Sequence, residues 1–207
     1  MNRSKRPPVI GLVGGIGSGK SAAAAILADL GCVVSDSDRD ARSVLADPEV
    51  VEVLRGWWGD TIVSTDGRPD RSAIAARVFG DPAQRSRLEA LVHPRLHRLR
   101  EIRFQSAPPD ARGLVIDAPL LFEADLDRQC DAIFFIDAPD GHRIDRVVTT
   151  RGWDEVELRR REQAQLPLDE KRDRASHVIE NAGTTSALEG RIRAALDSMT
   201  ESIDPLD

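Results

Sequence analysis

Short apolar runs alternate with longer segments of helical pattern along this chain of 207 residues. Strands that alternate with helices typically form a parallel sheet whose two faces are covered by helices. The pattern therefore predicts an α/β protein, in which a parallel five-stranded sheet is the middle of three layers. The predicted strands are Val9–Val13, Cys32–Val34, Leu114–Ile116, Ala132–Ile136 and His177–Ile179.

The section between the second and third predicted strands contains no obvious strand and several helical patterns. So much helix in a single crossover predicts an inserted helical subdomain over residues 38–109. Its helices are expected to begin near Pro48, after Asp70, at Pro82 behind an Asp81 cap, and at a break between His93 and Pro94.

A second helical section, residues 140–175, is dense in charge and holds many of the arginines. Charge runs usually form solvated helix faces, which is one interpretation. The other is a lid that closes over an anionic ligand. The core of a single domain over residues 8–200 would then comprise residues 8–37, 110–139 and 176–199, and residues 200–207 would form a disordered tail.

The composition is that of an ordinary soluble globular chain, 41% hydrophobic and 31% charged. A net charge of −6 argues against dedicated nucleic-acid binding. No apolar run approaches the length of a membrane span, and the N-terminus lacks the apolar region of a signal peptide. Cys32 and Cys130 have no metal-type spacing, so we interpret them as small buried side chains in a reducing compartment. These features predict a cytoplasmic protein.

The most informative motif is GGIGSGKS at Gly14–Ser21, which fits the pattern G-x-x-x-x-G-K-[ST]. It lies between the first predicted strand and an alanine-rich helical stretch, Ala22–Leu30. That context is typical of a phosphate-binding loop and not of a mere glycine-rich turn. Backbone N–H groups can then point into one concavity, and the helix adds its positive end. Lys20 can reach the β- and γ-phosphates of a nucleotide, and Ser21 can offer its hydroxyl to Mg²⁺. The loop also favours the lid interpretation, because transferred phosphates need cationic clamps.

Aspartates follow two of the predicted strands. Asp36 and Asp38 come after the second strand, where ligands bind in open α/β sheets. Asp38 could cap the next helix or take a proton from an acceptor hydroxyl, and one aspartate could do each. Asp117 ends the third strand in the shape of a Walker B element, which holds Mg²⁺. Asp137 ends the fourth strand in the same shape, so the pattern alone is weak.

Two further features leave alternatives open. The apolar loop Pro119–Glu123 either lines a pocket for an apolar substrate arm or packs in the core. His93 precedes a proline and is either a helix cap or a ligand contact.

Six motifs stand in the order found in dephospho-CoA kinases, and the chain resembles that P-loop family from about Pro8 to Met199. The glycine loop alone would not choose a family, whereas the ordered set does. The matching elements are GGIGSGKS (14–21), VVSDSD (33–38), LVHPR (91–95), DAPLLFE (117–123), QLPLDEK (165–171) and ASHVIENAG (175–183).

The resemblance implies a P-loop fold and an ATP-dependent kinase that phosphorylates the ribose 3′-hydroxyl of dephospho-CoA, the last step of coenzyme A biosynthesis. It implies Asp38 as general base, Lys20 at the phosphates and Arg146 as a lid arginine. Mg²⁺ would accompany ATP at Ser21 and Asp117. The ATP-binding residues would be Gly15, Ile16, Gly17, Ser18, Gly19, Lys20, Ser21, Ala22, Arg146, Asn181 and Gly183. The acceptor-binding residues would be Asp36, Asp38, Arg42, His93, Pro119, Leu120, Leu121, Phe122 and Glu123.

Three positions depart from the family pattern: Ala22 where threonine is frequent, Ser176 where aspartate is usual, and Arg151 five residues after Arg146 where four is usual. On a helix, one extra residue turns a side chain by about 100°, so Arg146 is the stronger candidate. Two alternatives remain, a kinase for another nucleoside or nucleotide and a nucleotide-operated switch. The chain contains no N-K-x-D guanine element, which argues against a GTPase. We expect a monomer or small homo-oligomer that binds small molecules, with no nucleic-acid or membrane partner.

Overall fold

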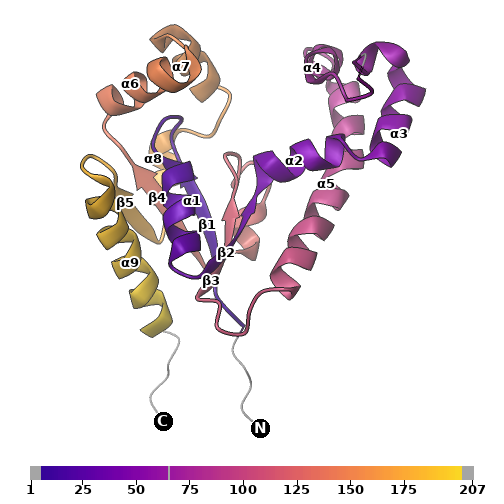
Figure 1. Ribbon diagram of the computed structural model, residues 1–207. Helices are drawn as coiled ribbons and strands as arrows, with labels where there is room; N and C mark the ends of the chain where they lie inside the picture. Colours follow the sequence, from indigo (N-terminus) through magenta and orange to yellow (C-terminus); the bar gives the residue numbers. More distant parts are fainter. Residues whose placement is uncertain (1–5, 65, 202–207) are drawn as a thin grey trace. The chain divides into compact units, whose positions relative to one another are not determined.

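The computed structural model describes residues 6–64 and 66–201, which form two compact units. The first unit comprises the chain up to Ser35 and from Ala107 onward, and the second spans Asp36–Ser106. Figure 1 labels the elements of both units. Within the described ranges, no helix has both the length and the hydropathy to span a bilayer.

The first unit is built on a five-stranded sheet with the strand order β2-β3-β1-β4-β5. The central strand β1 pairs in parallel with β3 and β4, and β4 pairs in parallel with the edge strand β5. The predicted sheet is therefore confirmed, with each strand one or two residues longer than its apolar run. The strands are β1 Val9–Gly14, β2 Cys32–Asp36, β3 Gly113–Asp117, β4 Ala132–Asp137 and β5 His177–Glu180.

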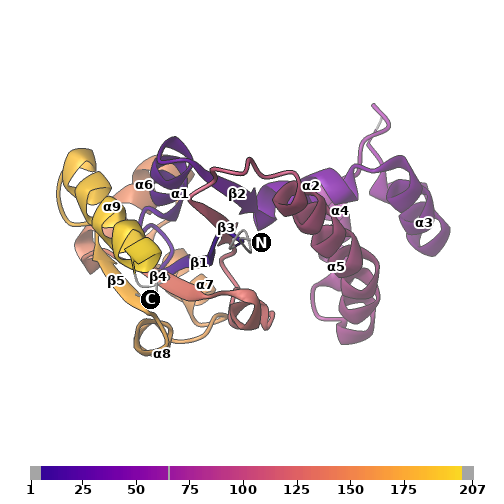
Figure 2. The same ribbon diagram turned by 90° about the horizontal axis from the view of Figure 1, so that it is seen from below.

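Helices cover the two faces of this sheet (Figure 2). The charge-rich section predicted as helical forms α6, α7 and α8, of which α6 and α7 lie at one end of the sheet (Figure 1). The helices of the first unit are α1 Lys20–Asp29, α6 Asp140–Arg151, α7 Glu155–Glu162, α8 Leu168–Asp173 and α9 Thr185–Glu201, with a 3-10 turn η2 at Leu126–Gln129.

Alternate residues of β1 serve the two faces, because successive side chains of a strand point to opposite sides. Ile10 and Leu12 are fully buried in a core shared with α1 and α9. Gly11 faces the other side, where a Cβ would come within 3.0 Å of Leu121 and 2.9 Å of Cys130. Both cysteines are free thiols, yet only Cys32 is buried as predicted, and Cys130 is half-buried. Burial raises the pKa of the Cys32 thiol to about 11, against the opposing charge of Arg112.

The second unit is helical and has its own core. Asp47, Asp70 and Asp81 cap three of its helices by accepting backbone N–H groups, which confirms the predicted starts. Asp40 and Arg103 form a two-bond ion pair between α2 and α5, and this pairing raises the pKa of Arg103. The elements are α2 Ser37–Leu45, α3 Pro48–Trp58, η1 Asp60–Ile62, α4 Arg71–Val78 and α5 Pro82–Gln105.

The predicted helix break at His93 and Pro94 is wrong, because α5 runs through Pro94 as one helix of 24 residues. Proline lacks the N–H that would close its turn and normally ends or kinks a helix. Apolar residues on both sides of Pro94 pack against one core cluster, which holds the helix together across it; these are Leu88, Leu91, Val92 and Leu96. The Arg95 side chain also donates to the Leu91 carbonyl at 3.0 Å, in the turn that proline weakens.

The predicted tail, residues 200–207, lies outside the described residues from 202 onward. Helix α9 includes Thr200 and Glu201.

Candidate active site

The glycine loop predicted to bind phosphates connects β1 to α1 and adopts conformations that suit only glycine. Gly17 and Gly19 have φ angles of 78° and 96°, in the left-handed region. A Cβ on Gly19 would lie 2.2 Å from the Asn181 amide nitrogen, and one on Gly17 would lie 2.6 Å from the Arg143 carbonyl oxygen. Both backbone shape and close packing therefore require these two glycines.

Helix α1 begins at the end of this loop with its N-terminal N–H groups uncapped by any side chain, and no acidic residue lies in its first turn. Five other helices differ, since α2, α3, α4, α5 and α7 each begin with an aspartate that accepts backbone N–H groups. Helix α6 also lacks a side-chain cap, but it carries Asp140 in its first turn. Uncapped N–H groups at a helix N-terminus attract anions. The start of α1 therefore has the chemistry of a phosphate site.

Lys20 and Asp117 meet at this edge of the sheet. Lys20 is the first residue of α1, and Asp117 ends β3, the neighbour of β1. The Lys20 Nζ lies 3.4 Å from Asp117 Oδ1, and the two side chains are 16% and 10% exposed. The predicted Walker B aspartate therefore lies beside the loop lysine.

The hydroxyls of the loop differ in exposure. Ser21, the predicted Mg²⁺ ligand, is exposed on the first turn of α1, one residue after Lys20. Ser18 Oγ is buried and has no hydrogen-bond partner among the described residues. The exposed Ser21 hydroxyl and the Asp117 carboxylate that pairs with Lys20 are oxygen donors of the kind that a magnesium nucleotide needs.

Arg146 and Asn181 both bind the backbone of the loop. Arg146 Nη1, from α6, donates to the carbonyls of Gly17 and Ser18 at 3.1 Å each, and its Nη2 donates to the Asn181 carbonyl at 3.3 Å. The Asn181 amide, which is buried, donates to the Ser18 carbonyl at 2.7 Å. In Figure 1, α6 and α7 lie at the end of the sheet where this loop follows β1. Two predicted nucleotide contacts are thus placed at the loop.

The other residues of these two motifs are placed less centrally. Gly183 is exposed two residues after Asn181. The Arg151 guanidinium lies over the Trp153 ring at 4.8 Å. Ser176, which replaces the usual aspartate, accepts the Ile133 N–H with its hydroxyl at 3.0 Å. The serine therefore fulfils a structural role between β4 and β5.

Core packing accounts for part of the loop Pro119–Glu123. Leu121 and Phe122 are buried, whereas Leu120 is 46% exposed. Glu123 accepts the Leu166 N–H at 2.8 Å and lies 3.1 Å from the ammonium of Lys171. Burial disfavours the charged form of Glu123, yet these two partners hold its pKa below the ordinary value. The residues of this loop that remain open to a ligand are those at its start.

Sequence reasoning assigned no role to Lys171 and did not select Arg143. The Lys171 side chain is 1% exposed and also contacts the Pro119 carbonyl at 3.3 Å and Gln165 Oε1 at 3.1 Å. Arg143 is buried and donates to the Ile16 carbonyl at 3.2 Å. Lys171 closes the QLPLDEK motif, which was a usable signal. Arg143 had none, because it stands in a charged section where solvated arginines are common.

The remaining predicted residues belong to the second unit. Asp36, not Asp38, caps α2, because its carboxylate accepts the Arg39 N–H at 2.9 Å. Asp38 is exposed in the first turn of α2, and Arg42 is exposed one turn later. His93 is exposed in the middle of α5, so the helix-cap alternative is wrong for it.

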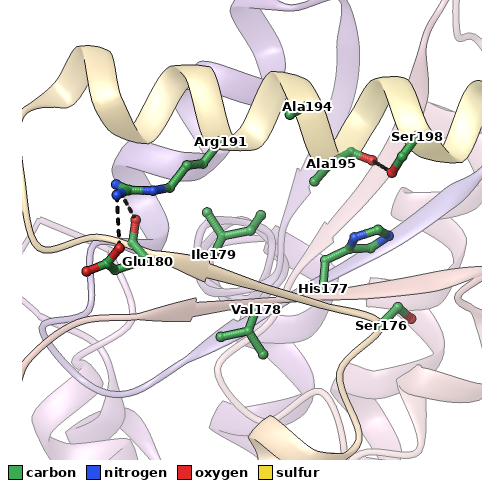
Figure 3. Close-up of a pocket in the computed structure, with 9 residues that line it drawn as sticks. All are labelled: Ser176, His177, Val178, Ile179, Glu180, Arg191, Ala194, Ala195 and Ser198. Atoms are coloured by element: carbon green, nitrogen blue, oxygen red, sulfur yellow. Dashed lines mark hydrogen bonds and ion pairs between the residues drawn. The ribbon is translucent and has the colours of Figure 1, made fainter.

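A pocket of about 620 Å³ lies elsewhere, between β5 and α9 (Figure 3). Glu180 and Arg191 form an ion pair of 2.9 Å at one end of it, and Ser198 donates to the Ala195 carbonyl at the other. None of the predicted ATP or acceptor residues lines this pocket. The candidate site is therefore the loop after β1.

Comparison with known proteins agrees with this geometry. The family model described as dephospho-CoA kinase matches residues 8–187. A dephospho-CoA kinase of Deinococcus radiodurans is 42% identical over 193 residues, which cover 92% of this chain and 91% of the relative. A crystal structure of a Thermus thermophilus protein superposes with a TM-score of 0.80 at 36% identity, over 97% of this chain and 100% of the other. A dephospho-CoA kinase structure from Campylobacter jejuni shares the fold, with a TM-score of 0.67 at 18% identity over 94% and 98% of the two chains. The chain belongs to the dephospho-CoA kinase family.

Proposed function

We propose that this protein transfers the γ-phosphoryl group of ATP to the ribose 3′-hydroxyl of dephospho-CoA, giving CoA and ADP in the last step of coenzyme A biosynthesis. Membership of the dephospho-CoA kinase family supports the acceptor. The observation that carries the phosphotransfer is the meeting of Lys20 and Asp117 beside the uncapped start of α1. The phosphates of ATP are held there by backbone N–H groups and by the ammonium of Lys20. When ATP binds, this ammonium leaves Asp117 and pairs with the phosphates. The ATP-binding residues are Gly15, Ile16, Gly17, Ser18, Gly19, Lys20, Ser21 and Ala22.

Mg²⁺ would be held by the Ser21 hydroxyl, with Asp117 as a direct ligand or through water. The exposed hydroxyl of Ser21 and the carboxylate of Asp117, which pairs with Lys20, are hard oxygen donors of the kind that Mg²⁺ prefers. The ion would neutralise and orient the phosphates. Lys20 adds a cationic charge to the same oxygens.

Asp38 is the general base of the proposal. Its carboxylate is exposed and is not used as the α2 cap, a role that Asp36 fills. Asp38 accepts the proton of the ribose 3′-hydroxyl as the new O–P bond forms and the bond from the γ-phosphorus to ADP breaks. Asp36, Arg42 and His93 contribute to the acceptor site. The loop residues Pro119, Leu120, Leu121, Phe122 and Glu123 contribute as well, the buried ones by shaping it.

Arg146, Asn181 and Gly183 complete the nucleotide site. Arg146 supplies positive charge near the phosphates from α6, while Asn181 and Gly183 lie where the adenine is held. Support for Arg146 and Asn181 comes from their bonds to the loop backbone. We further propose a cytoplasmic monomer or small homo-oligomer whose partners are ATP and dephospho-CoA, with no nucleic-acid or membrane partner.

The test is ADP production from Mg-ATP with and without dephospho-CoA, with the mass of the product recorded. We expect acceptor-dependent ADP together with CoA, one phosphate heavier than its precursor. ADP production that ignores dephospho-CoA would contradict the proposal, and a panel of other nucleosides and nucleotides would then identify the acceptor.

The base assignment has its own test. Asp38→Asn should lower kcat by on the order of 1000-fold while Mg-ATP affinity stays within about twofold, because only proton transfer is lost. Asp47→Asn is the matched control, since Asp47 is an exposed aspartate of the same unit whose capping role asparagine can fill. Strong residual turnover in Asp38→Asn would contradict the assignment.

A further inference from the structure

Arg143 has an environment unlike that of the other arginines in the charged helices. Its side chain is only 6% exposed, although α6 is a surface helix. A buried guanidinium needs partners for its N–H groups, because an unpaired buried charge is strongly destabilising. Arg143 has three: Glu162 of α7, Asp140 of its own helix at 2.5 Å, and the Ile16 carbonyl of the glycine loop at 3.2 Å.

The carboxylate partners of Arg143 belong to a closed ring of alternating charge. Glu162 also pairs with Arg159 at 3.2 Å, and Arg159 pairs in turn with Asp140. The ring lowers the pKa of Asp140, chiefly through its bond with Arg159, and raises that of Arg159. Two residues of α6 and two of α7 are thereby tied together. Only Arg143 also reaches the loop.

The contact with the Ile16 carbonyl fixes the orientation of one peptide group of the loop. A trans peptide group is planar, so its C=O and the following N–H point in opposite directions. A carbonyl held toward Arg143 therefore directs the Gly17 N–H away from α6. The close packing of this contact leaves little freedom, since a Cβ on Gly15 would lie 2.8 Å from Arg143 Nη1.

We propose that Arg143 and Glu162 are positioning residues that hold the Ile16–Gly17 peptide in the orientation that binds the phosphates of ATP, and so couple this loop to helix α7. The inference rests on the proposed role of the loop in ATP binding. It adds residues that do not touch the nucleotide. Glu162 acts through Arg143, and Arg143 acts through the backbone.

The test compares two glutamates of α7. Glu162 bonds Arg143 and Arg159, and its matched control Glu157 bonds Arg160 and Arg161 of its own helix and has no bond to the loop among the described contacts. Glu162→Gln should raise the Kd for Mg-ATP about tenfold, because a charge-assisted bond to a buried arginine is lost. Glu157→Gln should leave this Kd within about twofold. The KM for dephospho-CoA should change little in either variant.

A second variant guards against misfolding. Arg143→Gln combined with Glu162→Gln leaves no unpaired buried charge, and Asp140 keeps Arg159. This double variant should keep the Tm of Glu157→Gln and still bind Mg-ATP about tenfold more weakly than the native protein. A folded double variant that binds Mg-ATP as tightly as the native protein would overturn the inference, as would equal effects of Glu162→Gln and Glu157→Gln. The binding assay contains no acceptor. If the native protein bound Mg-ATP but did not phosphorylate dephospho-CoA, the result would contradict the proposed function and not this coupling.

Discussion

The ends of β3 and β4 carry the same sequence pattern, three apolar residues and an aspartate, but they have different environments. Both strands flank β1 in parallel, so both aspartates lie at the same edge of the sheet. Asp117 is 10% exposed and pairs with Lys20 of the glycine loop. Asp137 is 33% exposed and pairs with Arg172 of α8 at 2.9 Å, while its carbonyl accepts the Asn181 N–H at 2.6 Å.

Neighbouring residues of α8 contact these two regions, one in the loop after β3 and the other at the end of β4. Lys171 is buried and reaches Glu123 in the loop after β3. Arg172 is 53% exposed and reaches Asp137 itself. The pattern of apolar residues before an aspartate thus places a carboxylate at the ligand-binding edge of the sheet, and the neighbour in space decides whether it serves chemistry or structure.

The largest difference between the two strand ends should appear when each aspartate is replaced by asparagine. Asp117→Asn should lower kcat about 100-fold, because the site loses the charge that faces Lys20 and Mg²⁺. Asp137→Asn should change kcat by no more than about threefold, since it loses one partly exposed ion pair. Steady-state turnover with Mg-ATP and dephospho-CoA measures both, and equal losses in the two variants would erase the distinction between the strand ends.

A smaller effect should come from the two basic residues of α8. Lys171→Met should lower the free energy of unfolding by about 2 kcal/mol, because it removes a buried ammonium and leaves Glu123 with one partner fewer. Arg172→Met should cost no more than about 0.5 kcal/mol, as expected of an exposed pair. Urea denaturation followed by circular dichroism compares the two. A larger loss in Arg172→Met would show that the β4 end is the more strongly anchored one.

The sheet could be predicted from the sequence because each strand is an apolar run between turn or helix signals. The helix starts at Pro48, Arg71 and Pro82 could be predicted from prolines and aspartates at the starts of the helical patterns, whose effect is local. The continuity of α5 through Pro94 could not be predicted, because it depends on core contacts made by residues on either side of the proline.

The residues of the candidate site also fall into those that the sequence could predict and those that it could not. The loop and Lys20 were recognisable because a phosphate-binding backbone needs glycines at fixed spacing. The sequence could not show whether Asp36 or Asp38 caps α2, because an aspartate at either position suits a helix cap. The roles of Arg143 and Lys171 depend on hydrogen-bond partners that lie up to 127 residues away for Arg143 and up to 52 for Lys171, which no local pattern encodes.

The smallest effect should be a pH dependence confined to the loop after β3. Folding holds the pKa of Glu123 below its ordinary value of 4.5, so its charged form contributes stability above that pH and loses this contribution as the pH falls through the folded pKa. The Tm of the native protein should therefore exceed that of Glu123→Gln at pH 7, and the gap should narrow below pH 4.5. In a Lys171→Met background the gap at pH 7 should already be smaller, because one of the two groups that favour the carboxylate is gone. A gap that is the same with and without Lys171 would show that the Leu166 N–H alone holds Glu123, and that the buried ammonium does not distinguish the end of β3 from the end of β4.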